Sequence, residues 1–229
     1  MCGYARRHIT VDKLRKFVDL IQVPPESLAA PELRHYYPAF GGAASRTLDL
    51  VVGGEGGRRV IGATWWFDCQ EEVDTLRVNN QRTTFNARNL TSPYWRGAIR
   101  HNRGMFLATG IGEGKVIDGK NRHFLVESEE PILMGCVYRS FPNGCNSAAI
   151  ITRDSHPRFE PYHDKAFPLM LPQDPTFIDL WLSDAREDEP QIAELLANPR
   201  IFNDLEIRPV KTFKGAVAIG ESVRLGRDL

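Results

Sequence analysis

The sequence has few cysteines, no long apolar run and no net charge, and each shortage excludes a class of protein. Its four cysteines lie far apart and form no Cys-x-x-Cys pair, so they predict neither a zinc site nor a disulfide framework. No apolar run reaches the roughly 18 residues that a membrane-spanning helix needs, and the first residues lack the apolar centre of a secretory signal. We therefore expect an intracellular protein with reduced thiols and no membrane partner.

The zero net charge hides a segregation of charge along the chain. Residues 77–112, the arginine-rich segment, hold six arginines and no acid (6 − 0 = +6), whereas residues 173–206 hold two bases and nine acids (2 − 9 = −7). A basic stretch that also contains Phe85, Tyr94 and Trp95 is typical of a surface that tracks phosphates and stacks bases. The sequence leaves open the alternative that these arginines pair with the acidic segment.

The secondary-structure pattern is mixed and dominated by short strands. Apolar spacing predicts a helix over residues 10–21 with Thr10 as its cap, and residues 48–52 and 59–67 predict a hairpin around a glycine-rich turn. Further strands are expected at 105–107, 123–126, 132–138, 148–152, 208–212 and 216–219, and short helices at 179–182 and 191–197. Without alternation of strands and helices, this pattern predicts one α+β domain over residues 1–229, mainly antiparallel β with a few peripheral helices.

Cys2 is the most informative single position. Its small side chain favours removal of Met1, which would leave a terminal cysteine whose α-amine and thiol titrate at about 8 and about 8.5. Such a 1,2-aminothiol can condense with an aldehyde to a thiazolidine, or it can act as an N-terminal nucleophile in amide chemistry.

Three further polar residues supply what either chemistry needs. Asn86 offers an amide that orients an oxygen, Glu113 a carboxylate that exchanges protons, and His163 an imidazole that titrates near neutrality. Each also has a purely structural interpretation, as a turn residue, a solvated hairpin carboxylate and a surface imidazole.

The order of short motifs along the chain resembles the SRAP family, the SOS-response-associated peptidases. The segments are MCGY, NARNLT, RGMFLATGIGEG, AAIITRDS and HDKAFP, and they span essentially the whole sequence. The resemblance implies a barrel-like fold and a protein that binds single-stranded DNA containing abasic sites. It further implies crosslinking with associated peptidase or lyase activity, no cofactor and no metal. We expect a monomer in the cytoplasm of a bacterial or phage-infected cell, at the nucleoid when it is bound to DNA.

The resemblance also assigns roles to individual residues. Cys2 would form a thiazolidine with the ring-opened sugar, Asn86 would hold the α-amine or a sugar oxygen, Glu113 would be the general acid and base, and His163 would contact the sugar or phosphate. DNA contacts are expected from Arg88, Lys165, Thr152, Arg82 and one of Trp65 and Trp66, the other tryptophan belonging to the core.

The sequence departs from the family pattern around the site. Tyr4 replaces an arginine, Phe40 a proline, Lys165 an arginine and Gly114 a tryptophan, while residues 111–112 replace an aromatic pair. These departures predict a divergent member with a thinner wall around Glu113. Two other functions stay open: a cysteine-dependent N-terminal-nucleophile protease or amidohydrolase, and a catalytically inactive DNA-binding module.

Overall fold

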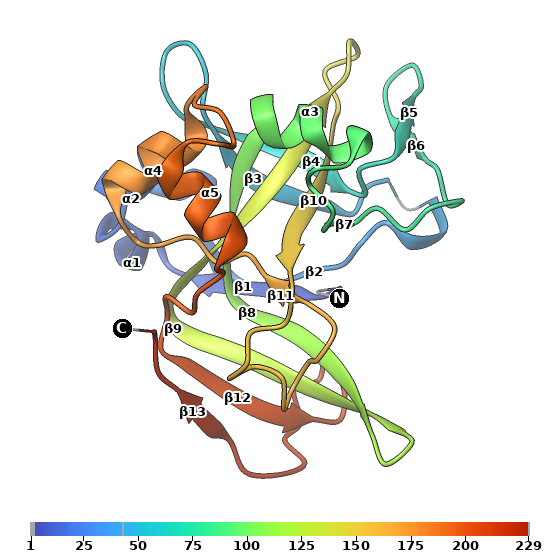
Figure 1. The fold of residues 1–229 in the computed structure, drawn as a ribbon, viewed down its shortest axis with the longest axis vertical. Coiled ribbons are helices and arrows are strands. Elements are labelled where there is room, and N and C mark those ends of the chain that lie inside the picture. The colour runs from blue at the N-terminus through green and yellow to red at the C-terminus, as the bar shows by residue number, and fades with distance from the viewer. Residues whose placement is uncertain (1–2, 43, 229) are drawn as a thin grey trace.

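The computed structural model describes residues 3–42 and 44–228, and Cys2 therefore lies outside the described residues (Figure 1). In this part of the chain eleven strands form the main sheet. They are β1 (Ala5–Ile9), β2 (Ala30–Tyr36), β3 (Thr47–Val52), β4 (Arg59–Trp65), β7 (Asn86–Ala87), β8 (Arg103–Ile117), β9 (Lys120–Ser140), β10 (Asn146–Arg153), β11 (Phe167–Pro168), β12 (Leu205–Val210) and β13 (Val223–Leu225). Strands β5 (Cys69–Glu71) and β6 (Leu76–Val78) form a separate pair.

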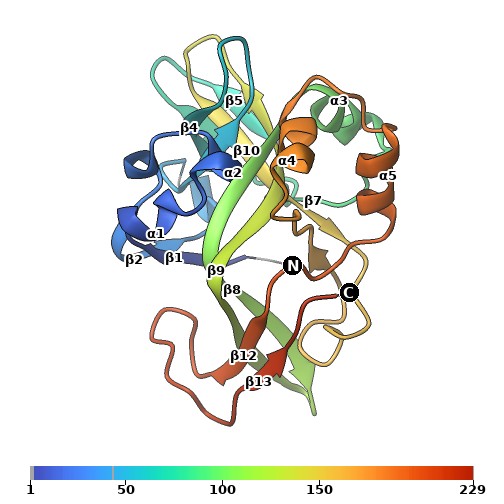
Figure 2. The ribbon, with the colours of Figure 1, turned by 90° about the vertical axis from the view of Figure 1, so that its left-hand side faces the viewer.

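The helices are short and lie outside the sheet. They are α1 (Val11–Arg15), α2 (Val18–Ile21), α3 (Pro93–His101), α4 (Pro175–Leu182) and α5 (Pro190–Ala197), with 3-10 turns η1 (Pro25–Ser27) and η2 (Phe40–Gly42). Helices α3, α4 and α5 gather on one side of the sheet, and α1 and α2 lie on another (Figure 2). No helix within the described residues is both long and apolar enough to cross a membrane.

Five strands close into a barrel. Strands β9, β10, β4, β3 and β8 are neighbours in that order, and β8 also pairs with β9, which completes the ring. All of these pairings are antiparallel except that of β10 with β4. This confirms the expected α+β, mainly antiparallel and barrel-like fold. Closure also leaves these five strands without a free edge.

Both faces of the barrel strands are apolar, because neighbouring side chains on one strand belong to two different buried clusters. Successive side chains point to opposite faces of a sheet, and on β8 Phe106 belongs to one buried cluster while Met105 and Leu107 belong to another. The first cluster contains Trp65 and fills the barrel, whereas the second is completed by helix residues such as Trp181 of α4. The helices are thus held by the outer faces of β8, β9 and β10.

Beyond the barrel, β8 and β9 continue as a long ribbon. Their pairing runs on from Gly110↔Glu127 to Ile117↔Lys120, and β12 and then β13 add to the outer edge of β9 (Figure 1). The register shifts between Ala108 and Gly110, where the ribbon leaves the barrel. Glu113 stands on this extension, just past the rim.

The local predictions differ from the structure in three places. The helix expected over 10–21 is split into α1 and α2, although Thr10 does cap α1 by accepting a hydrogen bond from the backbone N–H of Lys13 at 3.3 Å. Segments 123–126 and 132–138 belong to one strand, β9. Segment 216–219 makes only an isolated bridge, Val210↔Ala218, and the strand that pairs with β12 is β13. The hairpin of β3 and β4 is confirmed.

Candidate active site at the barrel rim

Glu113 and His163, fifty positions apart in the sequence, meet in a buried pair. Nδ1 of His163 lies 3.6 Å from Oε2 of Glu113, and the two side chains are 4% and 1% exposed. The same Nδ1 lies 2.7 Å from the carbonyl oxygen of Gly114. Because a carbonyl can only accept, Nδ1 carries the proton of the neutral ring and Nε2 is the acceptor nitrogen. Two of the predicted catalytic residues therefore lie together.

The environment of His163 favours its neutral form. Burial lowers the pKa of His163, and the hydrogen bond to the Gly114 carbonyl opposes this shift without reversing it. The loop that carries His163 is fastened nearby, because Ser155 Oγ donates to the His163 carbonyl at 2.7 Å and Lys115 Nζ donates to the Glu160 carbonyl. A neutral imidazole with a fixed tautomer can accept a proton on Nε2.

The N-terminal segment runs beside the strand that carries Glu113. Ala5 pairs with Ile111 in the register of β1 and β8, and the Gly112 N–H donates to the Tyr4 carbonyl at 3.0 Å. Tyr4 follows Cys2 by two positions and Gly112 precedes Glu113 directly. The backbone pairing thus places Tyr4 and Ala5 beside the part of β8 that leads into Glu113.

The aromatic residues missing from β8 are replaced by two rings behind it. A Cβ at Gly112 would lie 2.7 Å from the Phe213 ring and 2.8 Å from the Tyr4 ring, and these rings stack at 5.2 Å with an interplanar angle of 18°. The Tyr4 hydroxyl also lies 2.7 Å from Nδ1 of His35. Since neighbouring strand residues face opposite sides, the rings support β8 from the face opposite Glu113. Only glycine fits at position 112.

Asn86 enters the fold through β7. It pairs in parallel with Ile150 of β10, and the following pair is Ala87 with Ile151. Thr152 comes next on β10, where it pairs with Pro168 of β11. Asn86 and Thr152 therefore lie on neighbouring strands, Asn86 partly exposed and Thr152 only 1% exposed.

The basic side chains that the sequence predicts to contact DNA are exposed to solvent, which phosphate binding requires. Arg88, Lys165 and Arg82 are all exposed. Arg88 forms an ion pair with Asp154 at 2.8 Å, and the Arg82 guanidinium lies 6.0 Å from the centre of the Tyr94 ring. The hydroxyl residue of the set, Thr152, is buried, so a contact of Thr152 with DNA would require an opening in the surface above it.

Trp65 and Trp66 are both core residues, which corrects the prediction that one of them stacks on a base. They are 0% and 3% exposed, and their indole nitrogens donate to the carbonyls of Phe85 and Asn79, each at 2.9 Å. Alternation would put one ring outside, but β4 ends at Trp65, and the Trp66 N–H turns back to donate to the Thr64 carbonyl at 2.7 Å. The turn redirects the second ring inward.

Phe40 is the exposed aromatic residue that the sequence did not assign to the site. It is 50% exposed and packs edge-on against Trp66 and Phe85, with ring centres 5.4 and 5.1 Å apart. Phe85 directly precedes Asn86, so Phe40 lies close to the segment that carries Asn86. The signal available in the sequence was the substitution of Phe for a rigid proline in HYYPAF.

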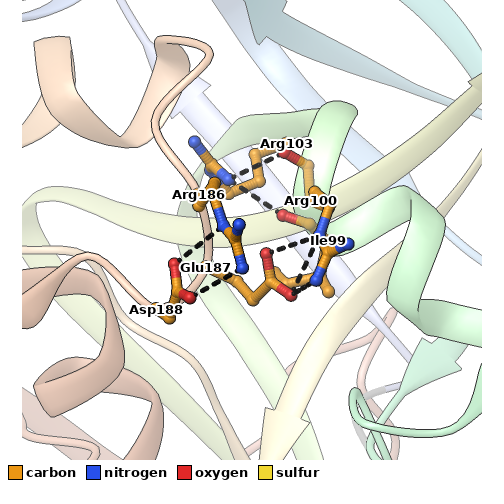
Figure 3. Close-up of polar contacts among 6 residues, drawn as sticks. All are labelled: Ile99, Arg100, Arg103, Arg186, Glu187 and Asp188. Carbon is orange, nitrogen blue, oxygen red and sulfur yellow. Dashed lines mark hydrogen bonds and ion pairs between the residues drawn. The ribbon is translucent and has the colours of Figure 1, made fainter.

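Part of the arginine-rich segment is structural, as the alternative interpretation proposed. Arg100 makes a two-pronged ion pair with Glu187, which lowers the pKa of Glu187 to about 2 (Figure 3). Arg103, 4% exposed, donates to the carbonyls of Trp181, Ser183 and Ala185 at 2.6 to 2.8 Å. These two arginines hold the segment around α4 and are not open to a ligand.

The remaining cysteines are poor nucleophiles or lie elsewhere. Burial raises the pKa of Cys69 to about 12 and raises that of Cys136 further, so both thiols stay protonated near neutrality. Cys145 is partly exposed at the turn before β10. Within residues 3–42 and 44–228, no group of three or more His, Cys, Asp or Glu side chains could hold a metal ion.

Comparison with known proteins decides the family. The model of the SOS response associated peptidase (SRAP) family matches residues 1–217. The chain belongs to the SRAP family. SRAP membership associates the chain with the SOS response and thus with DNA damage. No curated protein sequence matches the chain.

Solved structures share the SRAP chain's fold at low sequence identity. A Bordetella bronchiseptica protein matches with a TM-score of 0.65 at 15% identity, over 92% of this chain and 100% of its own. A Bacteroides thetaiotaomicron protein has a TM-score of 0.63 at 15% identity, over 92% and 93% of the two chains. A phage-related protein from Bordetella bronchiseptica has a TM-score of 0.63 at 16% identity, over 94% and 97%. At these identities the likeness concerns the fold alone.

Proposed function

We propose that this SRAP protein binds single-stranded DNA at an abasic site and captures the opened sugar through Cys2 after removal of Met1. The observation that carries the proposal is the buried pair of Glu113 and His163, in which Glu113 belongs to β8, the strand to which Tyr4 is hydrogen-bonded. This arrangement offers a proton-transferring carboxylate where the N-terminal segment approaches β8. The SOS association of the family supports a damaged-DNA substrate.

The proposed chemistry is a condensation that loses one water. Glu113 gives a proton to the ring oxygen and takes up the proton of the C1 hydroxyl, so the bond between C1 and the ring oxygen breaks and the sugar opens to its aldehyde. The Cys2 amine attacks the aldehyde carbon, water leaves to give an imine, and the thiol adds to the imine carbon while its proton passes to nitrogen. No oxidant or reductant is needed. His163, neutral and fixed through Gly114, positions Glu113 and accepts a hydrogen bond from the opened sugar on Nε2.

DNA contacts are assigned to the exposed groups around this pair. Arg88 and Lys165 bind phosphates, Lys165 as a point charge without two-pronged geometry. Phe40 takes the stacking role that the buried tryptophans cannot fill, because its ring is half exposed and supported by Phe85. Asn86, on the strand that follows Phe85, holds the amine or a sugar oxygen.

The decisive experiment is a crosslinking assay on a denaturing gel. Protein with Met1 removed, as verified by intact-mass spectrometry, is incubated with a single-stranded oligonucleotide that carries one abasic site. We expect a heat-stable shifted band for the wild-type protein and for Cys145→Ala, a matched control in a partly exposed thiol. Cys2→Ala should give no band, and Glu113→Gln should slow its formation.

Three outcomes would contradict the proposal. Absence of a band from fully processed wild-type protein, despite salt-sensitive DNA binding, would leave an inactive DNA-binding module. Cys2-dependent cleavage of a protein substrate without any DNA adduct would instead favour the N-terminal-nucleophile hydrolase. Complete retention of Met1 in cells would also exclude the thiazolidine, because the Cys2 amine would then be an amide.

A further inference from the structure

A pocket lies beside α3, and neither Glu113 nor His163 lines it. Its volume is about 330 Å³, and it is lined by Phe67, Tyr94, Ala98, Asn102, Tyr138 and Arg139. Three of these six residues are aromatic and none is acidic. We name it the α3 pocket. Aromatic walls combined with an amide and a guanidinium are the usual surroundings of an unpaired nucleobase.

The aromatic wall of the α3 pocket is held in place by neighbouring rings. Tyr94 packs edge-on against Phe67 and Trp95, with ring centres 5.8 and 4.7 Å apart, and Phe67 also contacts Trp95 at 4.7 Å. Tyr94 nevertheless remains 37% exposed. Burial of its hydroxyl end raises the pKa of Tyr94 to about 12, so the phenol stays neutral. A fixed, partly exposed ring can accept a stacking partner at low entropic cost.

The charges around the α3 pocket suit a nucleic acid. Arg139 is exposed and lies 4.9 Å from the Phe141 ring centre, while Arg82 lies 6.0 Å from that of Tyr94. Besides burial, three charged groups near the Tyr94 hydroxyl affect its pKa: the carboxylate of Asp68 raises it, and the two arginines lower it. Guanidinium groups stack on bases and bind phosphates, so the rim complements a phosphate-linked base.

A short segment connects the α3 pocket with the proposed active site. The Phe67 N–H donates to the Thr84 carbonyl at 3.2 Å, and the Asp68 N–H donates to Thr84 Oγ1 at 2.9 Å. Thr84 also hydrogen-bonds to the Tyr94 side chain. Since Thr84 precedes Asn86 by two residues, their Cα atoms are at most about 7 Å apart. A strand held at Asn86 can therefore reach the pocket within a few nucleotides.

We propose that the α3 pocket binds an unpaired nucleobase of the DNA strand that carries the abasic site, at a flanking position. The base stacks on Tyr94, its polar edge faces Asn102, and Arg139 binds the base plane or the adjoining phosphate. The inference rests on the proposed function for the identity of the strand. It deepens that function by adding a subsite that selects single-stranded over duplex DNA, because a paired base cannot enter the pocket.

The test is a base-deletion scan with a stable abasic analogue. Each oligonucleotide carries a tetrahydrofuran residue, which cannot open to an aldehyde, and a second tetrahydrofuran that removes one flanking base at a time. Fluorescence anisotropy gives the dissociation constant of each. With wild-type protein, removal of one particular flanking base should weaken binding by about five- to a hundredfold, the usual range for one stacked base.

The variants then locate that base. Tyr94→Ala and Arg139→Gln should bind the parent oligonucleotide more weakly and should lose most of the penalty for the sensitive position. Tyr94→Phe keeps the ring and should behave as wild type. Arg224→Gln, an exposed arginine on β13, is the matched control for Arg139 and should leave the scan unchanged. Circular dichroism verifies that each variant is folded.

The outcomes separate this proposal from the crosslinking reaction. A sensitive position coupled to Tyr94 supports the α3 pocket even if an aldehyde-bearing oligonucleotide forms no adduct with Cys2. The pocket would be overturned, and the crosslinking left intact, if an adduct forms but no flanking base affects binding. The same holds if the loss of affinity from removing a base simply adds to the loss caused by Tyr94→Ala or Arg139→Gln. Failure to bind single-stranded DNA would overturn both.

Discussion

The two ends of the arginine-rich segment have the same charge in the sequence but opposite surroundings in the fold. Arg100, near the C-terminal end of the segment, is paired with Glu187 (Figure 3). Arg103 is occupied by backbone carbonyls around α4. Arg82 and Arg88 flank Asn86 and are exposed. A run of like charge thus divides into a part that holds helices onto the barrel and a part that is open to a ligand. Only the second part can contribute to DNA binding.

The largest expected effect is a loss of stability on replacing Arg103, at the structural end of the segment, which holds Arg100 and Arg103. Replacing Arg103 by leucine leaves the carbonyls of Trp181, Ser183 and Ala185 without their donor in a buried place. We expect the free energy of unfolding to fall by about 3–5 kcal/mol, because three carbonyls lose their donor and each buried unsatisfied group costs about 1–3 kcal/mol. Urea denaturation followed by circular dichroism measures this change.

The matched control for Arg103 is an exposed arginine of the same segment. Arg96→Leu on α3 should change the free energy of unfolding by less than about 0.5 kcal/mol. Equal effects of the two substitutions would show that the division of the segment is wrong. Arg103→Leu protein that is folded should retain its affinity for single-stranded DNA, because Arg103 is not assigned to DNA binding.

The salt dependence of DNA binding tests the exposed end of the arginine-rich segment, which holds Arg82 and Arg88. Arg88→Gln removes one phosphate contact, so the slope of log affinity for single-stranded DNA against log salt should become shallower by about 0.7, and Arg82→Gln should act in the same direction. Asp154→Asn removes the carboxylate that pairs with Arg88 at 2.8 Å and should strengthen binding at low salt. Unchanged slopes in both arginine variants would contradict the assignment of this end to DNA.

The sequence could predict the fold class and the composition of the site, but not its geometry. Two apolar runs around a glycine-rich turn identified the β3 and β4 hairpin, and the motif order led to Glu113 and His163. The pairing of these two depends on the register of β8 with β9 and on the loop after β10, which no local pattern specifies. The two rings that pack behind Gly112, Tyr4 and Phe213, come from opposite ends of the sequence, so no pattern local to residues 111–112 indicates them.

Trp66 shows a second limit of sequence patterns. Alternation holds only while the strand continues, and β4 stops one residue before Trp66. The exposed ring of the cluster is Phe40, which lies 26 positions earlier in the sequence and meets Trp66 and Phe85 only in the folded barrel. The residues that face solvent near Asn86 therefore follow from where the strands end, and propensity alone does not indicate them.

The smallest expected effect is the acid sensitivity of the structural end. Arg100 lowers the pKa of Glu187 from 4.5 to about 2, so the folded state binds its proton more weakly than the unfolded state does. The resulting stability is present above about pH 4.5 and is lost as the pH falls toward 2. Arg100→Gln should remove this part of the pH dependence and leave stability at pH 7 slightly reduced, because ion pairs that solvent can reach contribute little. Unfolding measured from pH 7 to pH 3 should give a shallower decline for the variant, and parallel curves would mean that Glu187 is not held by Arg100. DNA affinity at pH 7 should not change, because Arg100 lies on the structural side of the division.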